Sequence, residues 1–324
     1  MRDRLTTLSV VLPVYNVAKW LEKCLDSIFQ QTRPADEVIA VDDGSTDNSY
    51  EILSRYAKIH PQLKIIQQEN QGLSVARNTG MDAVSGDYLI FIDSDDFIDK
   101  NMYSIMMNMV TCNKLDMAIC NGWFYFENRA PNRLINNIEN SIVMPGKEWL
   151  KERLRSKEIT HMVWMHIYKT RFIKKEKFEF IPGQVHEDVI WTNQALIAAE
   201  TIQYIDKPLY YYRIRQNRSG ADQIRRSIEY VIPCSVTNTN ILIDIANNIK
   251  QDSELAQLMR WQAVDSGFAV FHLIEKLSNK KSRIEQLNTL WNSNFFRLMW
   301  NNSTSINHKR KVIRLTIKKF LRLI

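Results

Sequence analysis

The sequence predicts an α/β protein with a mainly parallel sheet and helices on both faces, followed by a helical region. In the first 100 residues, short apolar runs alternate with segments whose apolar residues recur every three or four positions. This β-α-β-α-β-α-β order is typical of a parallel sheet. From about Ser227 only the three-to-four spacing remains. We therefore expect a first domain over residues 1–220 and a helical C-terminal region over residues 221–324.

The expected elements of the first domain follow at short spacing. Four buried strands are predicted at residues 8–12, 38–41, 63–66 and 88–92, with Pro13 ending the first. Three helices are predicted between them, at residues 18–31, 48–59 and 71–83. The first of these helices has an apolar side formed by Trp20, Leu21, Cys24, Leu25, Ile28 and Phe29.

Polar clusters follow three of these strands. They are residues 13–16 (Pro-Val-Tyr-Asn), 42–47 (Asp-Asp-Gly-Ser-Thr-Asp) and 93–96 (Asp-Ser-Asp-Asp). Ligands of parallel α/β sheets bind beyond the carboxyl ends of the strands. Each cluster alone would also fit a solvated loop, but their joint placement predicts one binding site at that edge of the sheet.

The second half of the first domain is less regular. Strands are expected at residues 117–120, 123–126 and 202–205, and an exposed polar loop at 130–140. A helix begins near Pro145, residues 162–168 are buried, and a helix over 184–199 carries the acid pair Glu187-Asp188 at its start. An aromatic run follows at residues 210–213. We expect Trp164 and Trp191 in the core rather than on a sugar-stacking surface.

Composition sets limits on the class of protein. The chain has 324 residues, of which 45% are hydrophobic and 24% charged, so a sizeable core is expected. No apolar run approaches the roughly 18 residues of a membrane-spanning helix, and residues 1–7 do not resemble a secretory signal. We therefore expect a cytoplasmic protein. Its four cysteines form no metal-binding or redox motif, and we expect reduced thiols.

The charge is concentrated at one end of the chain. The net charge is +7, and from Gln286 onward there are eight Lys or Arg residues and no acid. Subtracting these leaves 35 basic and 36 acidic residues in the rest of the chain. A neutral body with one basic appendage argues against a nucleic-acid-binding protein.

The last residues have the pattern of a basic amphipathic helix. Such helices bind anionic membrane surfaces, and the alternative is a helix that packs on the body with a solvated basic side. One predicted face is apolar, comprising Ile313, Ile317, Phe320, Leu321 and Ile324. The other is basic, comprising Lys311, Arg314, Lys318 and Arg322.

Four motifs in order, residues 13–16, 41–47, 72–80 (Gly-Leu-Ser-Val-Ala-Arg-Asn-Thr-Gly) and 91–96, resemble family 2 glycosyltransferases. The segments 186–188 (His-Glu-Asp) and 211–213 (Tyr-Tyr-Arg) extend the resemblance to about residue 220. The resemblance implies a GT-A fold, a nucleotide-sugar donor and inversion at the anomeric carbon. It also implies that Pro13, Tyr15 and Asp43 lie around the base and ribose, with Asp42 close by, and that Arg77 approaches the base or the diphosphate.

The resemblance assigns the chemistry to the two acid clusters. Asp95 would bind Mn²⁺ or Mg²⁺ across the two phosphates. Asp93 would face the donor and is a further expected metal ligand. His186 is either a further metal ligand, an acceptor contact or a structural histidine. Asp188 would be the catalytic base, with Glu187 supporting it or holding the acceptor. Three residues, Tyr212, Arg213 and Arg215, would close over the diphosphate.

Residues 121–123, 160–165 and 180–183 also resemble bacterial lipopolysaccharide-core glycosyltransferases, including ones that transfer a hexuronic acid. The expected function is transfer from a UDP-sugar to a hydroxyl of a cell-surface glycan precursor, at the inner face of the cytoplasmic membrane. One alternative is an O-antigen or capsule enzyme that uses a neutral UDP-hexose. Another is a non-catalytic nucleotide-binding membrane scaffold. A nucleotidyltransferase is disfavoured, because no glycine-rich phosphate loop follows the first strand.

Overall fold

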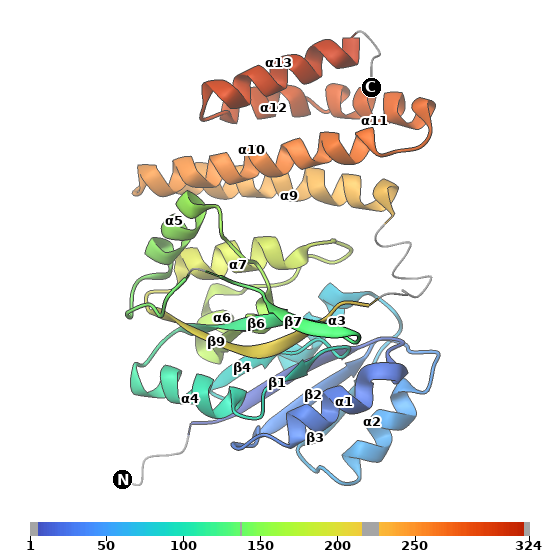
Figure 1. Cartoon of the computed structure of the whole chain (residues 1–324), viewed down its shortest axis with the longest axis vertical. Helices are drawn as coiled ribbons and strands as arrows, with labels where there is room; N and C mark the ends of the chain where they lie inside the picture. The colour runs from blue at the N-terminus through green and yellow to red at the C-terminus, as the bar shows by residue number, and fades with distance from the viewer. Residues whose placement is uncertain (1–5, 137, 216–226, 321–324) are drawn as a thin grey trace. The chain divides into compact units, whose positions relative to one another are not determined.

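The computed structural model describes residues 6–136, 138–215 and 227–320 (Figure 1). These residues form two compact units. The first comprises residues 6–150 and 160–215, and the second residues 151–159 and 227–320. The first unit contains the sheet, and the second consists of helices (Figure 1).

The parallel half of the sheet contains four strands in the order β3-β2-β1-β4. These are β1 (Leu8–Val14), β2 (Glu37–Asp42), β3 (Leu63–Gln67) and β4 (Tyr88–Phe91). In β1, β2 and β4 every residue is buried, as expected of strands covered on both faces. All four carboxyl ends therefore lie at the same edge of the sheet.

The sheet continues beyond β4 with strands of both directions. β8 (His166–Lys169) lies antiparallel between β4 and β6 (Met117–Phe126), and β9 (Ile202–Arg213) runs parallel to β6. The short strands β5 (Phe97–Ile98) and β7 (Arg129–Arg133) pair antiparallel with β9 and β6. The result is a mixed, mostly parallel sheet with flanking helices, so the predicted fold class is confirmed.

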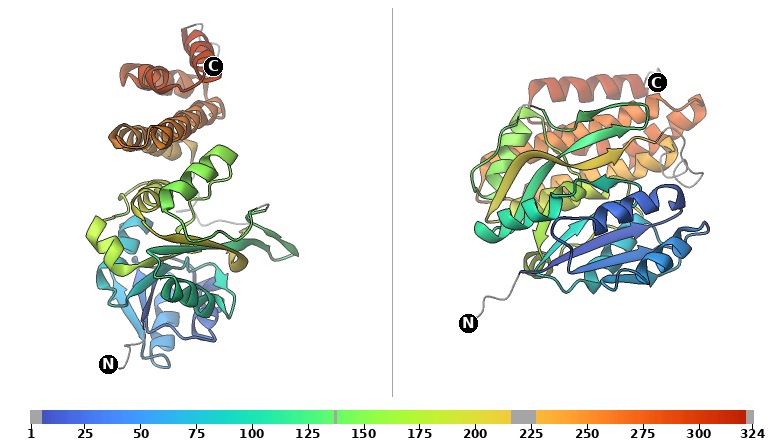
Figure 2. Two further views of the ribbon diagram at one scale, coloured as in Figure 1. Left: turned by 90° about the vertical axis from the view of Figure 1, so that its left-hand side faces the viewer. Right: turned by 60° about the horizontal axis from the view of Figure 1, so that its bottom comes forward.

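Crossover handedness places the helices. The connections through α1 (Ala18–Phe29) and α2 (Ser49–Ala57) step in one direction along the sheet, and the one through α3 (Leu73–Ala83) steps back. Right-handed crossovers therefore put α1 and α2 on one face and α3 on the other (Figure 2). The remaining helical segments before residue 200 are α4 (Met102–Cys112), α5 (Gly146–Ser156), the 3₁₀ turn η1 (Val163–Met165), α6 (Thr170–Glu176) and α7 (Glu187–Ala198).

Strand β1 continues through Pro13, where we had expected it to end. The Val11 carbonyl accepts a hydrogen bond from the Ile92 amide, and β4 itself ends at Phe91. The backbone N–H and C=O groups of successive residues in a strand point alternately toward its two neighbouring strands. The backbone of Pro13 therefore points toward β4, as that of Val11 does, but just past the end of β4. Its missing N–H therefore removes no hydrogen bond from the sheet.

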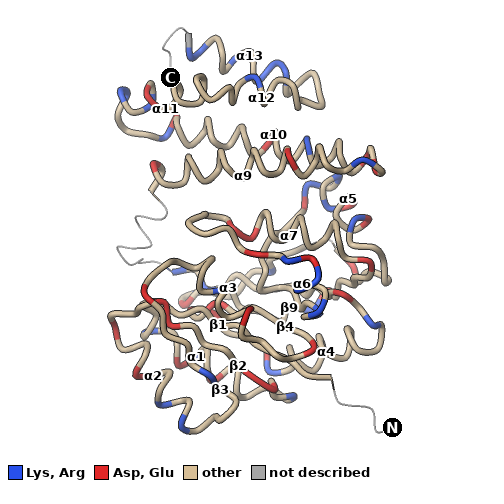
Figure 3. The backbone as a smooth tube through the Cα atoms, turned by 180° about the vertical axis from the view of Figure 1, so that it is seen from behind, with Lys and Arg blue, Asp and Glu red and all other residues tan. Residues whose placement is uncertain are grey.

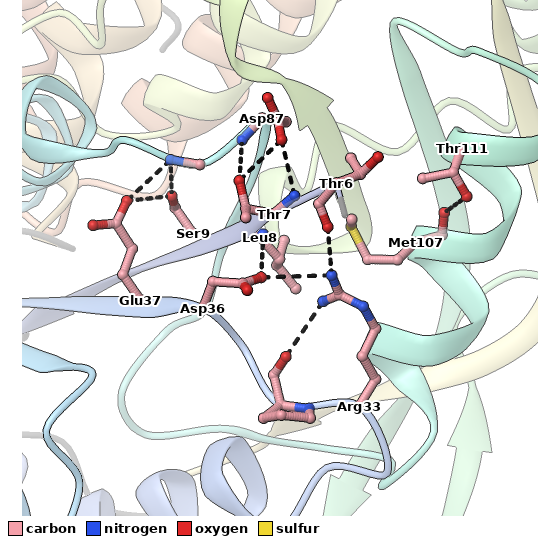
Figure 4. A network of polar contacts seen from close by, with 12 residues as sticks. Thr6, Thr7, Leu8, Ser9, Arg33, Asp36, Glu37, Asp87, Met107 and Thr111 are labelled. Atoms are coloured by element: carbon pink, nitrogen blue, oxygen red, sulfur yellow. Dashed lines mark hydrogen bonds and ion pairs between the residues drawn. The ribbon is translucent and has the colours of Figure 1, made fainter. Parts of the chain in front are cut away.

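Three carboxylates, of which Glu37 is buried, fix the amino ends of the strands (Figure 4). Asp87 accepts hydrogen bonds from the amide and hydroxyl of Thr7 at 2.9 and 3.0 Å, and Asp36 accepts from the Leu8 amide at 2.8 Å. Glu37 accepts from Ser9, from the 85–86 turn and from Lys64. These contacts set the register of β1, β2 and β4, and thereby align their carboxyl ends.

Three expectations for the first unit need correction. The two strands predicted at 117–126 are one strand, β6, whose register shifts around Asn121 opposite Pro208. Strand 202–205 and the aromatic run are likewise one strand, β9. The predicted loop at 130–140 contains the exposed hairpin strand β7. Its polar sequence does not alternate, so the pattern gave no sign of a strand.

The second unit is a helical stack with its own core. Its helices are α9 (Ile228–Asn248), α10 (Ser253–Glu275), α11 (Lys280–Asn292), α12 (Phe295–Asn302) and α13 (Ile306–Phe320). Val264, Phe271, Phe295 and Met299 are among the residues of this core, and Val312 of α13 packs into it. No helix within the described ranges is both long enough and apolar enough to cross a membrane.

Candidate active site

The acid cluster after β4 is held in place by strand β9. Asp96 is fully buried and accepts hydrogen bonds from the Tyr210 hydroxyl at 2.9 Å and the Arg213 amide at 2.7 Å. The Tyr210 oxygen in turn accepts a hydrogen bond from the Asp93 amide at 3.1 Å. Asp96 therefore supports the loop from inside the protein. The Asp93 and Asp95 side chains, by contrast, are partly exposed.

Asp95 is paired with the end of β9. The Arg215 Nε donates to Asp95 Oδ2 at 2.5 Å, and its Nη2 also contacts that oxygen. The Arg213 Nε donates to the Asp95 carbonyl at 2.8 Å. The guanidinium of Arg215 lies 4.5 Å from the ring centre of Trp20 on α1. Two of the three residues expected near the diphosphate therefore contact Asp95.

The crowded carboxylates affect one another. Burial, and then repulsion from Asp93, raise the pKa of Asp95 above its ordinary value despite Arg215. Burial, followed by the charges of Asp95 and Asp93, raises the pKa of Asp96 well above its ordinary value. A cation at the partly exposed carboxylates of Asp93 and Asp95 would relieve this repulsion, so the site fits a hard divalent ion.

The described residues do not by themselves supply a complete set of metal ligands. No group of three or more His, Cys, Asp or Glu side chains able to hold a metal ion occurs within the described ranges. This fits an ion that is bound by one or two carboxylates and completed by substrate phosphates. His186 lies just before α7, is exposed and has a left-handed backbone with a φ of 59°. Its assignment as a metal ligand stays a prediction.

Arg77 connects the two predicted acid clusters. It lies on α3 and is 3% exposed, yet it donates from Nη2 to Asp93 at 2.7 Å and from Nη1 to Glu187 at 2.6 Å. Burial by itself would lower the pKa of Arg77, but Asp93 and Glu187 outweigh that effect and raise it. The first turn of α7 is therefore held against the acid cluster by a buried cation.

Two features of α3 place Arg77. A side chain at Gly80 would bring its Cβ to 2.5 Å from Val11 Cγ1, so glycine allows α3 to pack closely on β1. Asn78 exchanges two hydrogen bonds of 2.8 Å with the backbone of Phe180. The Phe180 ring stacks on Trp191 of α7 at 4.2 Å. The segment leading into α7 is thus fixed to α3.

Asp188 differs from its neighbour Glu187. Within the described ranges, no side chain donates a hydrogen bond to the Asp188 carboxylate, whereas Glu187 is bound by Arg77. Burial, followed by repulsion from Glu187, raises the pKa of Asp188 to about 8, and the Asp93 charge contributes. A carboxylate with a raised pKa to which no side chain donates is suited to accept a proton.

The first two polar clusters form the other part of this edge. Asp42 ends β2, is 1% exposed and accepts from the Ser45 amide at 3.1 Å. Asp43, which is 2% exposed, accepts from the Gln71 and Gly72 amides at 2.9 and 2.8 Å. Asp43 therefore holds the start of α3. Pro13 is buried in β1, and Tyr15 follows that strand, half-buried.

The aromatic residues divide into core and rim. Trp191 and Trp164 are 1% and 4% exposed, as expected for core packing. Trp164 stacks on Tyr210 at 4.0 Å and on Tyr212 at 5.6 Å, so Tyr212 lies at the end of an aromatic stack. Sequence reasoning missed Tyr210, Trp20 and Asn78 as supports of the site. Asn78 carried a signal as part of the 72–80 motif, and Tyr210 carried one as part of the aromatic run at 210–213.

The chain is similar to known proteins in both sequence and fold. A model of glycosyl transferase family 2 matches residues 9–181. The uncharacterized glycosyltransferase YibD of Escherichia coli (strain K12) is 30% identical over 315 residues, 94% of this chain and 90% of that protein. Staphylococcus aureus TarS (residues 1–349), solved with UDP-GlcNAc, superposes with a TM-score of 0.72 at 22% identity, covering 95% of this chain and 90% of that one. The mannosyltransferase PcManGT of Pyrobaculum calidifontis, solved with GDP-Man and Mn²⁺, gives 0.55 at 14% identity, covering 98% and 88%.

Proposed function

The chain belongs to glycosyltransferase family 2 and has the GT-A fold, and we propose that it moves a sugar from a UDP-sugar to a hydroxyl of a cell-surface glycan precursor with inversion at the anomeric carbon. It is a glycosyltransferase, of enzyme class EC 2.4. The proposal concerns the donor nucleotide, the acceptor, the stereochemistry and the residues that act.

The main support is the Arg77 bridge. Arg77 pairs with both Asp93 and Glu187, so it holds Glu187 beside the acid cluster at the carboxyl edge of the sheet. The predicted base Asp188 is the next residue in the chain. Direct displacement requires a base on the acceptor side and positive charge on the leaving-group side of one anomeric carbon. In the proposal Asp188 would meet the first requirement, and Asp95, Arg213 and Arg215 the second.

In this proposal Asp188 takes the proton of the acceptor hydroxyl as its oxygen forms a bond to the anomeric carbon. The bond from that carbon to the β-phosphate oxygen breaks, and its electron pair leaves with UDP. Base assistance of this kind is typically worth about 10²–10⁴ in rate. Glu187 would orient the first turn of α7, and the guanidinium groups of Arg213 and Arg215 would face the developing negative charge.

Asp95, with Asp93, would hold the divalent cation. When bound, Mn²⁺ or Mg²⁺ would supply Lewis-acid stabilisation of the leaving diphosphate. The Mn²⁺ reported with PcManGT supports such an ion in the fold. The Arg215 side chain, now paired with Asp95, would then be available to the diphosphate oxygens.

The donor and acceptor are proposed from weaker support. TarS was solved with UDP-GlcNAc, and its fold extends over 95% of this chain, which supports a UDP-sugar here. The motifs at 121–123, 160–165 and 180–183 support a lipopolysaccharide-core acceptor and leave a hexuronic acid or a neutral hexose as donor sugar. A lipid-linked acceptor would place the reaction at the inner face of the cytoplasmic membrane.

A pair of measurements tests the proposal. UDP with Mn²⁺ should raise the melting temperature of the parent, because a ligand of the native state stabilises it. Asp188→Asn should keep that shift and lose transfer by about 10²–10⁴. Asp244 is an exposed acid on α9, and Asp244→Asn is the matched control, which should transfer sugar at the parent rate.

Transfer by Asp188→Asn at the parent rate would refute the base assignment. Binding of UDP without turnover of any UDP-sugar on glycan extracts would favour the scaffold alternative.

A further inference from the structure

Helix α13 has two apolar sides, and only one of them packs on the second unit. Val312 is 4% exposed, and His308, 5% exposed, lies against Trp261 and Phe268 of α10. By contrast, Ile306, Ile313 and Ile317 are 64%, 46% and 50% exposed. At about 100° per residue, these three isoleucines lie within about 40° of one another on the side away from Val312. We call them the isoleucine stripe.

Basic residues flank the isoleucine stripe. Arg310, Arg314 and Lys318 of α13 are exposed. No acid occurs in the sequence after Glu285, so the charged residues of α13 are all basic (Figure 3). Lys318 makes a surface ion pair of 2.9 Å with Glu275, and exposed pairs of this kind contribute little. The surface therefore combines protruding apolar side chains with positive charge.

An exposed tryptophan lies near this surface. Trp300 is 40% exposed. Lys309 of α13 lies 5.3 Å from its ring centre. Tryptophan is enriched at the boundary between lipid and water, where its ring is partly immersed and its N–H remains solvated.

The apolar and basic residues of this surface indicate which kind of partner could bind it. If a second copy of the chain bound through the same surface, its Arg310 and Arg314 would face the Arg310 and Arg314 of the first copy. No acid in α12 or α13 could pair with them. A nucleic acid would satisfy the cations but offers no apolar partner to three isoleucines. An anionic bilayer offers both, since acyl chains take the isoleucines and the headgroups face the basic side chains.

We propose that the exposed side of α13 docks on an anionic lipid bilayer, with Ile306, Ile313 and Ile317 inserted and Arg310, Arg314 and Lys318 at the headgroups. The sequence alone predicted an apolar face of Ile313, Ile317, Phe320, Leu321 and Ile324, of which the Phe320 side chain and residues 321–324 lie outside the described part. Because the buried and inserting sides of α13 differ, the helix stays packed on the second unit while it binds. This proposal concerns membrane binding alone and does not depend on whether the protein transfers a sugar.

Vesicle sedimentation with the full chain tests the proposal. The parent should bind vesicles of phosphatidylglycerol and phosphatidylcholine and should not bind pure phosphatidylcholine. Ile313→Ser with Ile317→Ser should lower the partition coefficient at least tenfold. Each neutralised cation, in Arg310→Gln and Arg314→Gln, should lower it about fivefold. The control is Ile142→Ser, at an isoleucine of the first unit that is 76% exposed, and it should bind as the parent does.

Three outcomes would overturn the proposal. They are a parent that ignores anionic vesicles, one that binds neutral vesicles equally well, and variants that bind as the parent does. Light scattering after size exclusion adds a check, because a parent dimer that the serine variant converts to a monomer would make a second copy the occupant. The arginine variants alter only exposed side chains, so they decide the matter if the serine variant fails to fold.

Discussion

Arg77 donates a hydrogen bond to Glu187 at 2.6 Å across 110 positions of sequence. Its second nitrogen bonds Asp93 at 2.7 Å, so one guanidinium connects α3, the loop after β4 and the start of α7. The geometry of the two acid clusters therefore depends on a side chain that is 3% exposed.

Arg77→Lys should lower kcat/KM by about 10²-fold or more. Lysine keeps the charge but cannot bond both acids with a planar fork, so the two clusters would separate. Breaking a buried ion pair typically costs about 3–5 kcal/mol, and the melting temperature should fall as well. Steady-state kinetics and thermal unfolding measure the two effects.

Arg55→Lys is the matched control for Arg77→Lys. Arg55 pairs with Glu22 at the surface, where the two side chains are 57% and 54% exposed. Such pairs are worth about 0–1 kcal/mol, so stability and kcat/KM should stay near the parent values. Equal losses in the two variants would show that the Arg77 bridge has no special role.

The rate should depend on pH through Asp188. Its pKa is raised to about 8, and only the ionised carboxylate can accept the acceptor proton. At pH values well below 8, kcat/KM should rise about tenfold per pH unit. It should level off above about pH 8. In Glu187→Gln the repulsion that raises this pKa is gone, so the midpoint should move to lower pH. A profile that is flat from neutral pH to pH 9 would contradict the assignment.

Glu37 should contribute to acid unfolding. Burial opposes its ionisation, but hydrogen bonds from Ser9, Ser85 and Lys64 outweigh that effect and lower its pKa to about 2 from an ordinary 4.5. The stabilisation is therefore full above about pH 4.5 and is lost as the pH falls toward 2. It amounts to about 3 kcal/mol. Denaturant unfolding should show that Glu37→Gln is less stable than the parent at neutral pH and that the two converge near pH 2.

Tyr210→Phe and Tyr103→Phe should differ in stability although both tyrosines are fully buried. The Tyr210 hydroxyl donates to Asp96 Oδ2 and accepts from the Asp93 amide, so its removal takes a partner from each of these groups at a cost of about 1–3 kcal/mol. The Tyr103 hydroxyl has no hydrogen-bond partner in the described structure, so its removal should be nearly neutral. Chemical denaturation compares them, and an equal cost would argue against the Tyr210 network.

The first 100 residues were predictable because each element is defined locally. The apolar runs of β1 to β4 and the helical spacing of α1 to α3 place their boundaries within a few residues. Beyond that point, contacts override the pattern. Asp206, Lys207 and Pro208 interrupt the apolar run of β9, yet the strand continues, because β6 shifts its register opposite Pro208.

The site was predictable in its chemistry but not in its connections. Asp93, Asp95 and Asp188 could be named from motifs, whereas the Arg77 bridge and the Asp96–Tyr210 bond join segments far apart in the chain. In α13 the helical spacing permits two apolar stripes. Only packing decides that Val312 is buried and that Ile313 and Ile317 face outward.

The fit of α3 on β1 at Gly80 has a practical consequence for engineering. The Val11 side chain leaves no room for a Cβ at this position, so larger residues would displace the turn that carries Arg77. A library that randomises residues 76–80 to change donor preference would lose most of its members to misplacement rather than to altered chemistry. Holding residue 80 as glycine, and varying only side chains that reach the carboxyl edge, keeps such a screen informative.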